Sequence, residues 1–274
     1  MAIKPKSPVD IPNTTGIITP ITPATTSLAN ARIGYKNLLT ATTTSGAQAM
    51  LTPNTWERYR PTSGSKTIKF QMPSDVVDFV GIAAHNAGTH DNGVNISVGY
   101  ATSVGGGVSN LDTMQFNDSN GALMIVFNPV VAQEIIITFS ASTSGLELGV
   151  IYAGLALEMP HGLWGGHAPI VLNGETKYQN TMSDSGNFLG RSIVRQGIET
   201  SYKWRHLDPD WIRSDFMPFV KSARKTPFFI LERPDTYTET AYGFTTNDIK
   251  PVNMSGGARL MEVGFNMRGH GDVQ

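Results

Sequence analysis

Short runs of alternating apolar and polar residues dominate the first half of the chain and predict strands. Residues 68–71 and 94–100 alternate cleanly, and residues 76–84 form a nearly continuous apolar run. Residues 123–127 and 134–139 add two shorter strands. Clusters rich in Gly, Asn and Pro separate these runs and indicate turns. We therefore expect a sandwich of antiparallel sheets.

The second half of the chain shows the same β pattern around a single helix. Strands are expected at residues 146–158, 192–204, 228–231, 242–245 and 260–267, whereas residues 161–190 form a polar, Gly-rich passage. Asp208 and Pro209 are typical of a helix N-cap and first turn, and predict a helix near residues 208–225. We expect Pro218 to kink or divide it.

Length and composition fit two β domains that follow an extended arm. A chain of 274 residues is long for one core, and 16% charged residues with 28 Gly and 16 Pro favour short strands. Residues 1–29 contain five prolines among many Thr and Ser, which predicts an arm, either frayed or ordered along a neighbouring subunit. We place the domains at residues 30–143 and 144–274.

Charge, cysteine content and hydropathy exclude several classes of protein. A net charge of −1 without a basic cluster argues against nucleic-acid binding. The absence of cysteine excludes disulfides, thiolate metal sites and a cysteine nucleophile. No apolar stretch approaches the roughly 18 residues of a membrane span, and none near the start resembles a secretion signal. We expect a soluble protein made in a cytoplasm, with no membrane insertion.

Motifs of catalysis and cofactor binding are missing from the sequence. It contains no nucleophile elbow, no phosphate-binding loop and no spacing of its six histidines that favours one metal ion. Asp208 and Asp210 flank Pro209, where a capping role explains them. We therefore predict that the protein is not an enzyme and has no catalytic residue, metal or cofactor.

The densest group of polar side chains follows the apolar run at residues 76–84. His85, Asn86, His90, Asp91 and Asn92 lie there, and such groups on an end loop are suited to sugar hydroxyls or Ca²⁺. The alternative is structural, with His85 and Asn86 satisfying backbone groups at a strand end. We favour the structural interpretation and keep the loop as a candidate ligand site.

A second candidate patch surrounds Trp56. The indole ring could stack on a sugar, but a single Trp in a sandwich is more often part of the core, and we predict core for Trp56. Arg58 and Arg60 share one face of an extended segment, with Tyr59 on the other. We expect the two arginines to act as hydrogen-bonding pins, and we keep Trp56 and Arg58 with the candidate ligand loop.

The N-terminal half resembles the discoidin, or galactose-binding-like, jelly roll. The resemblance is carried by residues 54–61 (NTWERYRP), 68–70 (IKF) and 77–88 (VDFVGIAAHNAG) and covers about residues 30–143. It implies a jelly-roll β-sandwich of a kind found in phage tail proteins. The ligand loops of that family vary, and none of its ligand residues can be assigned here.

The C-terminal half is similar to minor tail and distal-tail proteins of bacteriophages. Residues 188–192, the helix that leads into residues 227–229, and residues 261–269 carry this resemblance. It implies a tail-tube-like β-sandwich or barrel with one short helix, located in the virion and assembled in the host bacterial cytoplasm. The implied partners are further copies in a three- or six-fold ring, the tail tube protein, and hub or fibre proteins. Distal-tail proteins usually begin with the ring domain, whereas here it would follow the jelly roll.

Two functions follow from these patterns. The leading hypothesis is a structural component of the tail tip, a distal-tail or baseplate ring protein that joins the tube to hub or fibres. The alternative is a receptor-binding protein whose jelly roll binds a host surface glycan while its C-terminal domain anchors it. A glycan hydrolase is a third hypothesis, which the missing motifs disfavour.

Overall fold

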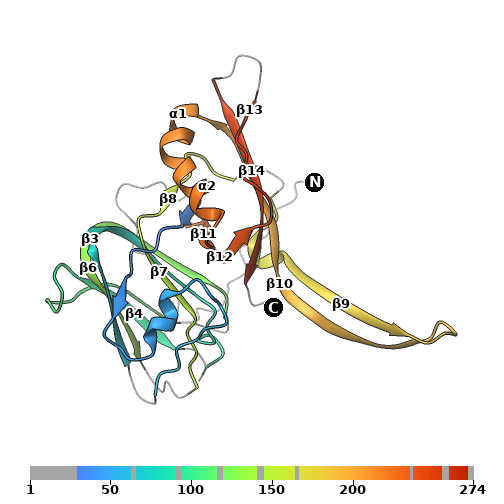
Figure 1. Ribbon diagram of the computed structural model, residues 1–274, viewed down its shortest axis with the longest axis horizontal. Coiled ribbons are helices and arrows are strands. Elements are labelled where there is room, and N and C mark those ends of the chain that lie inside the picture. Colours follow the sequence, from blue (N-terminus) through green and yellow to red (C-terminus); the bar gives the residue numbers. More distant parts are fainter. Residues whose placement is uncertain are drawn as a thin grey trace, which may run out of the picture.

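Over the residues that the structure describes, the fold is all-β with one short helical segment at residues 209–223 and two 3-10 helices (Ala47–Leu51 and Ile170–Leu172), which confirms the predicted fold class (Figure 1). The computed structural model describes residues 30–62, 66–90, 94–115, 120–140, 145–163, 167–234, 237–254 and 259–270. The predicted arm at residues 1–29 lies outside them. The strands are β1 (Arg32–Gly34), β2 (Ala41–Thr42), β3 (Lys66–Ala83), β4 (Asn95–Ala101), β5 (Ser109–Gln115), β6 (Leu123–Ser140), β7 (Val150–Gly154), β8 (Leu157–Glu158), β9 (Gly174–Met182), β10 (Phe188–Leu207), β11 (Phe228–Arg233), β12 (Tyr237–Thr245), β13 (Val252–Asn253) and β14 (Met261–His270).

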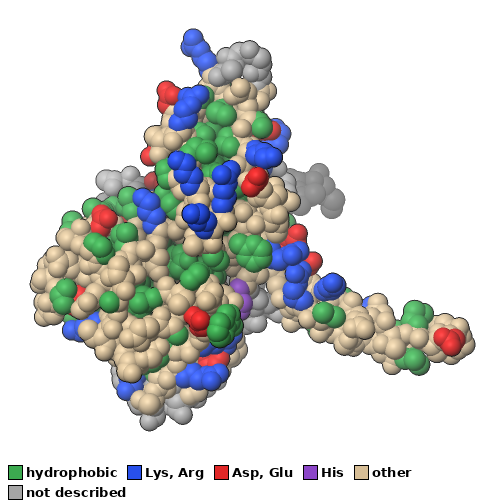
Figure 2. Space-filling model, viewed as in Figure 1, with side chains coloured by type: hydrophobic (Ala, Val, Ile, Leu, Met, Phe, Trp, Pro, Cys, Tyr) green, Lys and Arg blue, Asp and Glu red, His purple; other side chains and the backbone are tan. Residues whose placement is uncertain are grey.

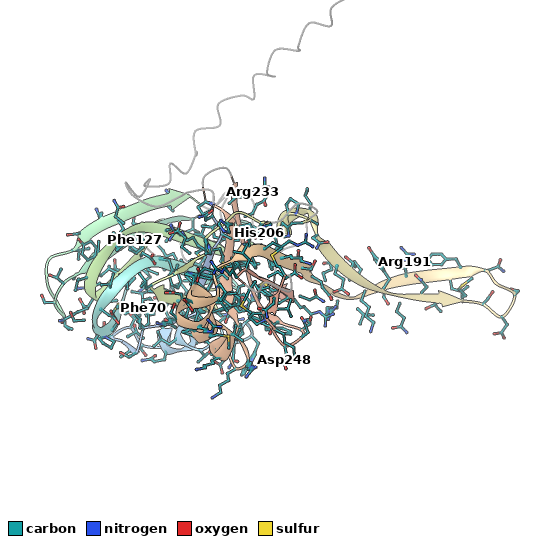
Figure 3. All side chains as sticks on the ribbon, turned by 90° about the horizontal axis from the view of Figure 1, so that it is seen from above. Phe70, Phe127, Arg191, His206, Arg233 and Asp248 are labelled. Atoms are coloured by element: carbon teal, nitrogen blue, oxygen red, sulfur yellow. The ribbon has the colours of Figure 1, made fainter. Side chains whose placement is uncertain are left out.

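A six-stranded antiparallel sheet surrounds the first of two main hydrophobic cores. Its order is β2-β3-β6-β4-β5, with β7 on the free edge of β3. Strands β3 and β6 each contain 18 residues, and each joins two of the shorter predicted strands into one. Two register shifts along their pairing allow these long strands to bend. Phe70 of β3 and Phe127 of β6 are buried in the same hydrophobic core (Figure 3).

An eight-stranded sheet with its own hydrophobic core lies beside the first (Figure 1). Its order is β8-β1-β11-β12-β14-β10-β9, with β13 on β14. The alternation predicted at the end of the chain is confirmed, since Val263, Phe265 and Met267 are buried on one face of β14. The helical segment packs on this face, where the ring of Phe219 lies 6.0 Å from that of Phe265.

The helical segment runs from residue 209 to residue 223. It consists of α1 (Pro209–Trp211), a π-helical turn (Ile212–Phe216) and α2 (Met217–Ala223). The predicted cap is confirmed, because the Asp208 carboxylate accepts hydrogen bonds from the N–H groups of Asp210 and Trp211. The chain stays helical through Pro218, and the division expected there takes the form of the preceding π-helical turn.

The strands cross the predicted boundary between residues 143 and 144 in both directions. Strand β1, near the start of the first predicted domain, pairs with β11 and β8 in the eight-stranded sheet. Strand β7, in the second predicted domain, pairs with β3 in the six-stranded sheet. The two sheets are therefore linked through exchanged strands as well as through side chains.

An aromatic cluster joins the two sheets. The ring of Tyr152 in β7 lies 5.5 Å from that of Phe229 in β11 and 5.8 Å from that of Tyr242 in β12. The Tyr242 hydroxyl also donates a 2.8 Å hydrogen bond to the carbonyl of Pro53. Gly81 in β3 lies so close that an added Cβ would be 2.8 Å from the Phe229 ring. Close packing of this kind holds the two sheets in one relative arrangement.

A long β-hairpin projects from the eight-stranded sheet. Strand β10 pairs with β14 only from Ile198 onward, and its earlier residues pair with β9 alone. This hairpin, which we call the β9–β10 hairpin, extends away from both sheets (Figure 1). The interpretation of residues 161–190 as a passage without strands is therefore wrong for residues 174–182 and 188–190.

Candidate functional site

The candidate ligand loop begins where β3 ends. Ala84 adopts a left-handed backbone conformation with φ of 55° and turns the chain out of the strand. Such a conformation is uncommon for a residue other than glycine. Gly149 permits the turn, because an added Cβ there would lie 2.7 Å from the Cβ of Ala84. His85 and Asn86 follow directly and lie at this end of the six-stranded sheet.

Asn86 ties the loop to the segment that precedes β7. Its Nδ2 donates a 2.9 Å hydrogen bond to the carbonyl of Gly145, and its Oδ1 accepts a 2.7 Å hydrogen bond from the N–H of Glu147. Both ends of the amide are therefore engaged with backbone, as the structural interpretation expects.

His85 is buried, with 4% of its surface exposed. Its Nδ1 accepts a hydrogen bond of 3.2 Å from the N–H of Ala87. Burial lowers the pKa of His85 to about 4, because the charged ring would lose its hydration. The ring is therefore neutral near pH 7 and supports the turn rather than facing a ligand.

His90 lies at the outer end of the same turn. Its N–H donates to the carbonyl of Asn86 at 3.0 Å, and the Oδ1 of Asn120 accepts from the N–H groups of Gly88 and Thr89. Asp91 and Asn92 lie outside the described residues. Of the five loop residues, the structure therefore brings together His85, Asn86 and His90.

Arg58 and Arg60 both pair with Glu147. The Nη1 of Arg58 lies 2.5 Å from Glu147 Oε2, and the Nη2 of Arg60 lies 2.7 Å from Oε1. These hydrogen bonds hold the pKa of Glu147 below its ordinary value. The predicted role of the two arginines as hydrogen-bonding pins is confirmed, since they fix residues 58–60 beside the Asn86 loop.

Trp56 is exposed, with 78% of its surface accessible, and the prediction that it belongs to the core is wrong. The segment around it is not a strand but a turn, so alternation does not decide which side chain is buried. Tyr59 is buried instead, and its backbone forms hydrogen bonds of 2.8 and 3.0 Å with Leu148. Trp56 therefore presents its ring to solvent two residues before Arg58.

Glu147 is the residue that joins the two candidate patches, and the sequence analysis missed it. Its backbone N–H binds Asn86, and its carboxylate binds Arg58 and Arg60. The one sequence signal for Glu147 is its position between two apolar residues, Leu146 and Leu148, because alternation then directs its side chain outward. Both leucines are buried in the structure. The resulting surface carries an exposed indole, two guanidinium groups and a carboxylate, which are groups that stack on and hydrogen-bond to polar ligands.

Within the described ranges, no group of three or more His, Asp or Glu side chains is arranged to hold a metal ion. In the part of the chain that the structure describes, no helix has the length and apolar character of a membrane span.

Comparison with known proteins gives structural likeness only. No family model and no curated protein matches the chain. A pectin-binding carbohydrate-binding module is 14% identical and covers 43% of this chain and 92% of its own, with a TM-score of 0.38. A chitosan-binding module from Paenibacillus sp. IK-5 is 14% identical, with coverage of 44% and 98% and a TM-score of 0.36. A fucolectin from striped bass serum is 10% identical, with coverage of 90% and 98% and a TM-score of 0.32. At these identities and TM-scores, the likeness assigns no ligand to this chain.

Proposed function

We propose that the protein is a self-assembling structural component of a phage tail tip, a distal-tail or baseplate ring protein between the tail tube and hub or fibre proteins. The observation that carries this proposal is the β9–β10 hairpin. It projects from the body and exposes large apolar side chains along its length: Tyr178, Met182, Phe188, Leu189, Ile193 and Val194, each between 48% and 64% accessible.

Such a hairpin is poorly suited to stand alone in water. A two-stranded hairpin without a third strand or a core is marginally stable, and exposed apolar surface favours association. The base of the hairpin is nevertheless fixed. Arg195 pairs with Glu175 at 2.7 Å, and Arg268 of β14 pairs with Glu199 at 2.6 Å. The hairpin therefore leaves the body in a set direction, as an assembly element requires.

The resemblance to phage tail proteins supports the same proposal. The similar segments correspond to the hairpin strand β10 (Phe188–Leu207), the start of β11 (Phe228–Arg233) and the central strand β14 (Met261–His270). All three belong to the eight-stranded sheet. Of these strands, β10 forms one side of the hairpin and β14 pairs with the hairpin's base, while β11 lies elsewhere in the same sheet.

Light scattering and electron microscopy of the purified full chain test this proposal. We expect closed rings whose mass is a small multiple of the 29.6 kDa chain. A chain that remains monomeric at every concentration up to the solubility limit would contradict it. Open aggregates of undefined size would also contradict it, because a ring requires closed symmetry.

A second function, binding of a host surface glycan, is favoured by the exposure of Trp56. An indole ring that is 78% accessible beside the Arg58–Glu147–Arg60 group offers a stacking face and charged hydrogen-bonding partners to a sugar. Arg58 and Glu147 are already paired, so the surface is preorganised.

Binding of the full chain to a panel of bacterial surface glycans tests this second function. We expect the variant Trp56→Ala to lose binding, whereas Tyr178→Ala, which removes an exposed aromatic ring from the hairpin, keeps it. Equal binding by the wild type and Trp56→Ala would remove Trp56 from the site. If phage particles can be prepared, loss of adsorption with intact particles would separate glycan binding from assembly.

A further inference from the structure

The eight-stranded sheet carries a groove between the end of α2 and the end of β12. Its volume is about 650 Å³, within the range of ligand-sized pockets. Val220, Ala223 and Ile249 supply apolar walls, and the ring of Phe244 is 48% exposed at its edge. The groove is therefore open, with buried apolar side chains at its base, the exposed ring of Phe244 at its edge, and polar residues along the rest of its lining.

Cationic side chains border this groove. Arg224 and Lys225 line it and are exposed at the end of α2, and Lys221 is exposed one turn earlier. Asp248 is the acidic residue in the lining. Figure 2 shows Lys and Arg side chains gathered over the position of α2. A ligand with an apolar surface and a negative charge suits this combination.

The tip of the β9–β10 hairpin has that character. Met182, Phe188 and Leu189 are each at least 60% exposed there. Asp184 lies between them in the turn, and residues 182–189 contain no Lys or Arg. Figure 2 shows an acidic side chain among apolar ones at the far end of the hairpin. The tip therefore offers apolar side chains to the exposed Phe244 ring and a carboxylate to the cationic border of the groove.

The tip cannot reach the groove of its own chain. Two views at right angles show the hairpin pointing away from the body, with Arg191 on the hairpin far from Asp248 beside the groove (Figures 1 and 3). Pairing along residues 174–198 and the ion pair between Arg195 and Glu175 keep the hairpin extended. A contact between tip and groove must therefore join two copies.

We propose that the tip of the β9–β10 hairpin in one copy occupies the groove between α2 and β12 in a second copy. This inference rests on the proposed self-assembly and names its contact surfaces. Phe188 and Leu189 pack against the exposed ring of Phe244, and Asp184 lies near Lys225. Because tip and groove are different surfaces, the contact is head-to-tail, and it generates a ring when the rotation between copies closes.

The absence of cysteine from the chain allows a direct test by disulfide trapping. We would mix two singly substituted variants, Leu189→Cys in the tip and Thr246→Cys in the groove lining, under mild oxidation. A disulfide-linked pair of the two variants is expected. The matched control mixes Thr246→Cys with Val104→Cys and should give no such pair. Val104 is exposed in the turn between β4 and β5, away from the hairpin.

Charge reversal provides a second test that does not depend on oxidation. Asp184→Lys and Lys225→Glu should each raise the dissociation constant between copies by about tenfold, because each places two like charges at the contact. The double variant should recover much of the loss, because the complementary charges are restored with reversed sign. Normal circular dichroism of each variant establishes that it is folded.

The outcomes separate this inference from the proposed function. The double variant Phe188→Ser/Leu189→Ser removes the apolar side chains of the tip. If it still forms rings, and if no disulfide forms between tip and groove, the proposed contact is wrong but self-assembly stands. A chain that neither associates nor traps at any concentration would overturn both. Trapping together with recovery in the charge-reversed double variant would support the contact.

Discussion

The hydroxyl group of Tyr202 donates a hydrogen bond of 2.8 Å to Oε1 of Glu232 beneath the eight-stranded sheet. The Nε2 of His167 lies 2.9 Å from the same oxygen, and the N–H of Ile170 donates to Oε2. Only 1% of Glu232 and 1% of Tyr202 is exposed. A buried carboxylate is tolerated when its oxygens are satisfied in this way, so the network links β10, β11 and the segment before β9.

Removal of the Tyr202 hydroxyl should destabilise the protein. In Tyr202→Phe, Glu232 loses a donor that water cannot replace, and we expect a loss of roughly 1 to 3 kcal/mol in the free energy of unfolding. Urea unfolding followed by fluorescence measures it. Tyr178→Phe, on the exposed hairpin, is the matched control and should change stability by less than about 0.5 kcal/mol. Equal effects of the two substitutions would contradict the role of the network.

The contact of Gly81 with Phe229 predicts a steric effect between the sheets. In Gly81→Ala the new Cβ would lie 2.8 Å from the Phe229 ring, which must shift. We expect a loss of roughly 1 to 3 kcal/mol, since overpacking strains a well-packed core. Gly107→Ala has no atom within 4 Å of its Cβ and serves as the control. Adding Phe229→Leu to Gly81→Ala should restore part of the lost free energy of unfolding, because the smaller side chain makes room for the new Cβ. If stability is not restored, the contact with Phe229 is not the source of the strain.

Asp78 should make stability depend on pH. Only 5% of Asp78 is exposed, and burial raises its pKa from 3.8 to about 6, although the N–H of Ala156 and the charge of Arg32 oppose this. Between these two values the folded chain binds the proton more tightly than the unfolded chain. The contribution of Asp78 is therefore fully present below pH 3.8 and is lost as pH rises through about 6.

The variant Asp78→Asn removes this titration and keeps an oxygen for the N–H of Ala156, which donates to Asp78 Oδ1 at 2.7 Å. The wild type should lose roughly 1 to 3 kcal/mol relative to Asp78→Asn as pH rises from 4 to 7. Urea unfolding at pH 4, 5, 6 and 7 measures the difference. Parallel curves for the two proteins would show that the carboxyl group titrates normally.

Strands that bury one face could mostly be predicted from the sequence, whereas a strand exposed on both faces could not. Alternation and apolar runs located β3, β4, β6 and β14, because each places Val, Ile or Phe against a core. Strand β1 is buried but has only three residues, too few to show a period, and it was not predicted. Strand β9 has the sequence GETKYQNTM and is exposed along nearly all of its length, so its residues carry no such period. Strand β9 was missed for this reason, whereas the strand predicted at residues 192–204 covers part of β10, the other strand of the hairpin.

The candidate site was predicted in part, for a similar reason. Arg58 and Asn86 were identified because polar groups next to apolar strands are conspicuous, but Glu147, to which both bind, lies far along the chain. Contacts over such separations depend on the fold and not on local pattern. Trp56 was assigned to the core from residue type alone, whereas its position in a turn determines its exposure.

His85 should make the protein sensitive to acid, in the direction opposite to Asp78. Burial lowers the pKa of His85 from 6.5 to about 4, so the unfolded chain takes up the proton first as pH falls. Stability from this residue is therefore present above pH 6.5 and is lost as pH falls through about 4, by roughly 2 to 3 kcal/mol.

The variant His85→Asn retains an acceptor for the N–H of Ala87 but does not titrate. It should be less stable than the wild type at pH 7, because it fills less of the buried site. The deficit should shrink as pH falls toward 4, since only the wild type loses stability through the imidazole. His161→Asn, at an exposed position, is the matched control for replacing an imidazole by an amide. A deficit that stays constant from pH 7 to pH 4 would show that the ring of His85 reaches solvent and protonates as freely in the folded as in the unfolded chain.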